Sequence, residues 1–102
     1  MQITYRVAGK TLYLYPDGEI DEASAAELRR RTDGIIDGHT DCDRVVFNLS
    51  SVRFMDSTGI GFLIGRYKKL DRYQIPMFLE NPNFSADKVL SVSGIYSLIP
   101  KI

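Results

Sequence analysis

The sequence predicts an α/β fold: a mixed, mainly parallel sheet opened by a β-hairpin, with three or more helices. Two observations predict it. The chain begins with two stretches that alternate apolar and polar residues, and helix-like and strand-like segments then alternate to its end. Helices placed between strands imply right-handed crossovers and therefore parallel pairing. The expected element order is β-β-α-β-α-β-α-β, in a single domain over residues 1–102.

The N-terminal segment predicts the hairpin. Residues 1–7 and 11–15 each alternate as a strand with one buried face does, and residues 8–10 form a short turn between them. The Pro-Asp-Gly sequence at residues 16–18 is typical of a turn, so we expect it to end the second strand.

The first helix is predicted from Asp21 onward, where the apolar spacing changes. Asp21 is placed to cap it, and Gly34 or Gly38 is placed to end it. The apolar or small residues that share one stripe of this helix are Ala25, Leu28, Thr32 and Ile35.

A buried strand and a second helix follow. Residues 44–49 contain three large apolar residues in succession, as in a strand covered on both faces. The helix is expected over residues 58–70, with Ile60, Leu63, Ile64 and Tyr67 on one side. Gly61 and Gly65 each cost this helix about 1 kcal/mol relative to Ala. Their spacing suggests a face that lets the helix lie close to the sheet.

The C-terminal part predicts three more elements. Residues 77–79 form a short strand after a proline, and residues 84–93 form a third helix that ends at Gly94. Residues 96–99 are expected to form the last strand. The third helix has two candidate caps at its start, Asn83 and Ser85.

Composition excludes several classes of function. Basic and acidic residues number thirteen each, which argues against a nucleic-acid binder with a strongly basic face. One cysteine, Cys42, and one histidine, His39, exclude a disulfide framework, a cysteine zinc cage and sites that need two histidines. The start lacks a signal sequence, and no apolar run is long enough to span a membrane. We expect a soluble cytosolic protein without a cofactor.

The topology predicts where a site would lie. In a parallel sheet, the loops that leave the carboxyl ends of strands gather at one rim, where helix N-termini also point. Residues 17–21, 51–58 and 80–83 are such loops. Asp21 and Ser57 are therefore expected at the same rim although they are far apart in the sequence.

The most informative loop covers residues 54–59, Phe-Met-Asp-Ser-Thr-Gly, at the start of the second helix. One interpretation is a helix cap, because Asp, Ser and Thr satisfy free backbone N–H groups there. The other is a phosphorylation site. A phosphate on Ser57 would add about 1.5 to 2 negative charges at the positive end of a helix, which accommodates it. Asp56 would repel it.

Two apolar residues precede the hydroxyls. Phe54 and Met55 are assigned to the core rather than to a partner contact. An exposed Met55 beside Ser57 would instead serve as an apolar anchor for a partner.

Three sequence blocks resemble the STAS domain of bacterial anti-sigma factor antagonists. They are Asp-Ser-Thr-Gly-Ile-Gly from residue 56 with Gly-Arg-Tyr-Lys from residue 65, Gly-Glu-Ile-Asp from residue 18, and Ser-Gly-Ile from residue 93. The Gly-Arg-Tyr-Lys block looks most like the sporulation antagonists of the sigma-F pathway. The blocks stand in the family's order along nearly the whole chain.

The resemblance implies a function without catalysis. An antagonist of this family binds an anti-sigma factor that is also a serine kinase and so releases a sigma factor; phosphorylation switches the binding off, and a metal-dependent serine phosphatase reverses it. The phosphorylated position corresponds to Ser57. Asp21 matches a family acid that lies near the acceptor. We predict the surroundings of the site and the partner contacts at Asp21, Met55, Asp56, Thr58 and Gly59.

Two departures from the family pattern are visible. Asn48 stands where many relatives carry Asp, away from the acceptor position. Relatives often continue into another helix, whereas this sequence ends at Ile102. We expect either one uncovered apolar surface or a natural short form of the protein.

Other functions fit less well. A serine hydrolase needs a base near Ser57 and a Gly-x-Ser-x-Gly elbow, and the first glycine is missing. A nucleotide binder needs a Gly-x-Gly-x-x-Gly or P-loop motif, and the sequence has neither. The remaining alternative is a STAS module of a general stress-response pathway or signalling scaffold, with a different partner.

Overall fold

The longest strand organises the sheet, because three of the other strands pair with it. The computed structural model describes residues 2–102. Its elements are β1 (Gln2–Ala8), β2 (Thr11–Ile20), α1 (Glu22–Asp37), β3 (Arg44–Asn48), β4 (Val52–Met55), α2 (Ser57–Arg72), β5 (Met77–Glu80), α3 (Phe84–Ser93) and the 3₁₀ helix η1 (Ile95–Ser97).

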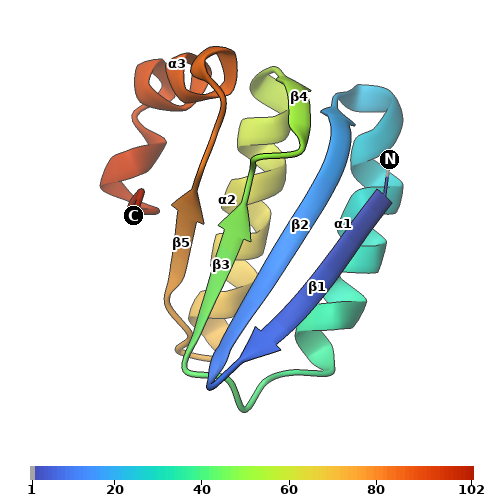
Figure 1. The fold of residues 1–102 in the computed structure, drawn as a ribbon, viewed down its shortest axis with the longest axis vertical. Helices are drawn as coiled ribbons and strands as arrows, with labels where there is room; N and C mark the ends of the chain where they lie inside the picture. Colours follow the sequence, from blue (N-terminus) through green and yellow to red (C-terminus); the bar gives the residue numbers. More distant parts are fainter. Residues whose placement is uncertain (1) are drawn as a thin grey trace.

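The sheet is mixed and mainly parallel, as predicted. Strand β1 runs antiparallel to β2, whereas β2 pairs in parallel with both β3 and β4, and β3 pairs in parallel with β5. The strand order is β1-β2-β3-β5, with β4 beside the second half of β2. Helices α1 and α2 lie behind the sheet in Figure 1, and the carboxyl ends of β2 and β4 point to its upper rim.

The core forms where apolar side chains of the sheet meet the two helices. Alternation along β2 turns Leu12, Leu14 and Ile20 to this side, and all three are fully buried. The central strand β3 is covered on both faces, as its apolar run predicts: Val45, Val46 and Phe47 are all 0% exposed.

Residues 16–18 do not end the second strand, contrary to the prediction, and β2 continues to Ile20. Pairing with β3 stops at Leu14, and pairing with β4 begins at Gly18. Pro16, which has no N–H group, therefore lies in the interval without a parallel partner. Gly18 has a φ of +120°, which favours glycine, and the register shifts directly after it. The turn-like sequence marks an exchange of partners.

Strand β4 was not predicted, because residues 51–58 were assigned to a loop. It covers only four residues, and its buried positions are the first and last, Val52 and Met55. Arg53 is the extra residue of a bulge, since Val52 pairs with Gly18 while Phe54 pairs with Glu19. The bulge removes the alternation by which a strand is recognised in a sequence.

The predicted last strand at residues 96–99 is also wrong. Gly94 ends α3 in the left-handed conformation, and the chain then turns through η1. Ile99 donates its N–H to the carbonyl of Ile95 at 2.8 Å, and both side chains are buried. A backbone hydrogen bond between residues four apart is typical of a helical turn and not of a strand. One bridge, between Leu79 and Lys101, holds the following residues against β5.

The buried face of α2 differs from the prediction. Its buried residues are Gly59, Phe62, Leu63, Arg66 and Leu70, while Ile60, Ile64 and Tyr67 are only partly buried. Gly61 and Gly65 do not bring the helix close to the sheet, since a Cβ atom added at either would meet nothing within 4 Å. The close approach is at Gly59, where a Cβ would lie 2.3 Å from Cγ of Met55.

Two ion pairs join α1 to α2. Nε of Arg66 lies 2.7 Å from the carboxylate of Asp33, and Nζ of Lys69 lies 2.8 Å from Asp37. The guanidinium of Arg66 is buried and also donates to the carbonyl of Phe62. A buried charge is tolerated only with such partners, so removing Asp33 would leave the guanidinium of Arg66 buried without its counter-ion.

We expect Gly59→Ala to lower the free energy of unfolding by about 1–3 kcal/mol, because the new methyl group must displace the buried side chain of Met55. Gly61→Ala in the same helix is the control. Open space surrounds that position, so alanine should stabilise the chain by about 0.5–1 kcal/mol through helix propensity. Urea unfolding followed by circular dichroism measures both; equal effects would contradict the packing at Gly59.

Candidate functional site

The rim is organised by two strands that end at the same level. Ile20, the last residue of β2, pairs with Met55, the last residue of β4. The next residues are Asp21 and Asp56, and each is the N-cap of the helix that follows. Two helix N-termini, with their positive dipole ends, therefore open at one edge of the sheet. The predicted juxtaposition of the two loops is confirmed.

The two caps satisfy backbone donors at the helix starts. The carboxylate of Asp21 accepts from the backbone N–H of Ser24 at 3.1 Å, and the hydroxyl of Ser24 accepts from the N–H of Asp21 at 3.2 Å. This is a capping box. In α2, the carboxylate of Asp56 accepts from the N–H of Thr58 at 2.9 Å. Capping is thus the structural role of both aspartates.

Ser57 is the first residue of α2, and its side chain is exposed. Because Asp56 supplies the cap, the hydroxyl of Ser57 is not required for it. The neighbouring Thr58 is half-buried. The capping interpretation of this loop therefore applies to Asp56, and phosphorylation of Ser57 stays a prediction.

Met55 and Gly59 are buried at the base of the loop and pack against each other. Met55 is 3% exposed and packs against Gly59, so in this structure it belongs to the core and offers no anchor to a partner. Phe54 is 46% exposed, and its assignment to the core is wrong. Phe54 pairs with Glu19 across β2, on the side of the strand that turns away from the core.

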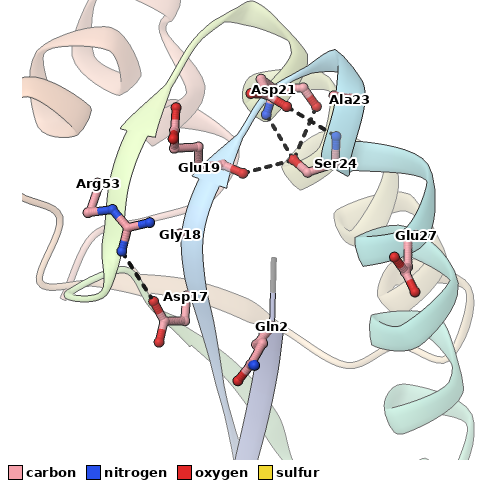
Figure 2. A pocket seen from close by; sticks show the side chains of 9 residues that line it. All are labelled: Gln2, Asp17, Gly18, Glu19, Asp21, Ala23, Ser24, Glu27 and Arg53. Atoms are coloured by element: carbon pink, nitrogen blue, oxygen red, sulfur yellow. Dashed lines mark hydrogen bonds and ion pairs between the residues drawn. The ribbon is translucent and has the colours of Figure 1, made fainter.

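An open cavity of about 580 Å³ lies beside Asp21, between the end of β2, the start of α1 and β4. Figure 2 shows Arg53 reaching toward Asp17 across its rim, and the hydroxyl of Ser24 donating to the carbonyl of Glu19. The guanidinium of Arg53 lies 3.8 Å from the carboxylate of Asp17. The carboxylates that line the cavity are Asp17, Glu19, Asp21 and Glu27. Arg53 was not expected at this site from the sequence, because the bulge that places it there was not predicted.

The third loop joins the same rim. Asn83 is the cap of α3, since its side-chain oxygen accepts from the N–H of Ala86 at 2.7 Å. Its side-chain nitrogen donates to the carbonyl of Val52 in β4 at 3.1 Å. The amide of Gly18 donates to the carbonyl of Ser51, so all three loops are connected.

The histidine of this chain does not lie at the rim that holds Ser57. The chain's histidine, His39, follows the C-terminal end of α1, at the opposite end of the helix from Asp21, and packs edge-on against Tyr5 with ring centres 5.0 Å apart. Within residues 2–102, no group of three or more His, Cys, Asp or Glu side chains is arranged to hold a metal ion. None of the helices described is long and apolar enough to cross a membrane.

Comparisons with known proteins agree on one family. The sequence profile of the STAS domain matches residues 2–102. The anti-sigma F factor antagonist of Paenibacillus polymyxa is 30% identical over 83 residues, which are 81% of this chain and 70% of that protein.

Solved structures show the same fold. The unphosphorylated anti-sigma factor antagonist SpoIIAA superposes with a TM-score of 0.78 and 22% identity, over 99% of this chain and 88% of that one. The phosphorylated form of SpoIIAA, a Bacillus cell fate determinant, gives a TM-score of 0.68 and 24% identity, over 99% and 91%.

We expect Asp56→Ala to lower the free energy of unfolding by about 1 kcal/mol, because the N–H of Thr58 loses its acceptor. Ser57→Ala should change it by less than about 0.5 kcal/mol, because that side chain is exposed. Thermal unfolding of the two variants beside the wild type separates them. A large loss in Ser57→Ala would show that the serine, and not the aspartate, caps the helix.

Proposed function

The chain belongs to the STAS domain family, and on this premise we propose that it is an anti-sigma factor antagonist controlled by phosphorylation of Ser57. The unphosphorylated chain binds an anti-sigma factor with serine kinase activity and thereby releases a sigma factor. Phosphorylation ends the binding, and a metal-dependent serine phosphatase restores it. The chain contributes a docking surface and an acceptor hydroxyl, and it has no catalytic role of its own.

One observation carries this proposal: Ser57 is exposed at the first position of α2, directly after the residue that caps the helix. A kinase docked at the rim reaches the hydroxyl without unfolding anything. The Oγ–P bond forms as the bond between the γ-phosphorus and its bridging oxygen breaks, ADP leaves, and the hydroxyl proton passes to a base of the kinase. The kinase supplies Mg²⁺ and ATP positioning.

The surroundings explain how one phosphate changes binding while the fold persists. The positive end of α2 tolerates an anion, so the phosphorylated helix stays intact. The cavity-lining carboxylates and Asp56 make the rim acidic already, and the phosphate adds about 1.5 to 2 further negative charges. At a desolvated interface such a charge without a partner costs several kcal/mol. A loss of about 3 kcal/mol lowers affinity more than a hundredfold.

The comparisons support this reading. The curated relative is named for antagonism of anti-sigma F factor, and SpoIIAA has been solved in unphosphorylated and phosphorylated forms that both share the fold of this chain. A protein of this fold thus carries a phosphate without refolding.

Intact-mass spectrometry after incubation with the cognate anti-sigma kinase and Mg-ATP tests the acceptor. We expect the mass of one phosphate on the wild type and none on Ser57→Ala. Ser85→Ala, which removes an exposed hydroxyl from the first turn of α3, is the matched control that is still phosphorylated. No phosphate in the presence of a demonstrably active cognate kinase would leave a STAS module that only binds, of the stress-response or scaffold kind.

The binding consequence is tested with a charge substitution. Ser57→Asp should weaken binding of the anti-sigma factor about tenfold, less than phosphate does because it carries one charge. Ser57→Ala should bind as the wild type does. Isothermal titration calorimetry measures both, and equal affinity of Ser57→Asp and Ser57→Ala would contradict an electrostatic switch.

A further inference from the structure

A groove separates α1 from α2 on the side of the helices that faces away from the sheet. Its volume is about 350 Å³, and its wall is built mainly from small residues, with Ala25 and Ala26 on α1 and Gly61 and Gly65 on α2. The groove begins at Thr58, the residue after Ser57. It is therefore continuous with the rim on which the proposed function rests.

The two glycines are not explained by packing within the chain. A glycine destabilises the interior of an α-helix by about 1 kcal/mol relative to alanine, and only proline destabilises it more. A Cβ atom at either position would meet nothing within 4 Å, so neither glycine admits a neighbouring element. Gly59 in the same helix differs, because Met55 occupies the space beside it. Bare backbone in an open groove is what a second molecule needs in order to approach a helix closely.

The charge of the groove selects the kind of molecule. Arg66 lines it but is neutralised by Asp33. Arg29 lines it as well, is exposed, and forms no ion pair with any carboxylate of residues 2–102. Burial lowers the pKa of the Arg66 guanidinium, the charge of Asp33 raises it, and the charge of Arg29 lowers it further. Two guanidiniums face one carboxylate, so the groove is positive.

We propose that this groove receives an amphipathic segment of the anti-sigma factor, with an apolar side chain laid over Gly61 and Gly65 and an acidic side chain beside Arg29. The inference rests on the proposed function and names the surface that the partner uses. It also explains how the phosphate weakens binding. A dianion on Ser57 lies at the end of the groove and repels the acidic segment of the partner.

The glycines provide a test in which stability and binding change in opposite directions. Gly61→Ala and Gly65→Ala should each raise the melting temperature by about 3–6 °C, because helix propensity improves. Both should weaken binding of the cognate anti-sigma factor, and Gly65→Leu should weaken it at least about tenfold. Gly34→Ala is the control: it is a helical glycine with nothing within 4 Å, and it lies outside this groove. It should stabilise the chain and bind as the wild type does.

The charge is tested separately. Arg29→Glu should weaken binding about tenfold or more, and raising the salt concentration should reduce the difference from the wild type. Arg31→Glu makes the same charge change on an exposed residue of α1 outside the groove and should stay within about twofold of the wild type at 0.15 M salt.

The outcomes distinguish the inference from the proposed function. A wild-type chain that binds the anti-sigma factor, with Gly65→Leu and Arg29→Glu binding equally well, keeps the function and overturns the groove. A wild-type chain that does not bind a competent anti-sigma factor refutes both. Self-association of the wild type that Gly65→Leu abolishes, measured by light scattering without partner, would assign the groove to a second copy and overturn the proposal.

Discussion

The structure depends on one register: the parallel pairing that sets Ile20 opposite Met55. Because β2 and β4 end at this pair, the next residue of each strand caps a helix at the same rim. The register is possible only because β2 exchanges β3 for β4 near Gly18, whose positive φ accompanies the shift. The exposure of the serine after the second cap, the acid-lined cavity beside the first cap and the groove between the two helices all follow from where these strands stop.

The residues that stabilise the chain are different from the residue that we propose to be phosphorylated. Asp56 caps the helix N-terminus, so the hydroxyl of Ser57, which we propose as the phosphate acceptor, is not needed for capping. The helices are held together elsewhere, by the ion pair of Arg66 with Asp33 and by core contacts. A phosphate at the rim breaks none of these interactions. In the proposed mechanism its effect is on the surface potential that a partner meets, which would change the affinity without a change of fold.

The sequence was sufficient for the mixed, mainly parallel character of the sheet, the three helices and the shared rim, because these depend on long apolar patterns and on caps. It was insufficient where a local irregularity, such as a bulge or an exchange of strand partners, interrupts the regular pattern of a strand. Pro16 and Gly18 look like a turn but serve an exchange of strand partners. A bulge at Arg53 hides β4. The spacing of Gly61 and Gly65 was noticed, but only the structure shows that the space beside them is open rather than filled by the sheet.

The most direct test is a calorimetric titration of the cognate anti-sigma factor into the chain before and after enzymatic phosphorylation, with backbone amide NMR spectra of both forms. The account predicts that affinity falls more than about a hundredfold. It also predicts that chemical-shift changes stay near Ser57 and the adjoining starts of α1 and α2. Equal affinities of the two forms, or shift changes spread through the core strands, would contradict it.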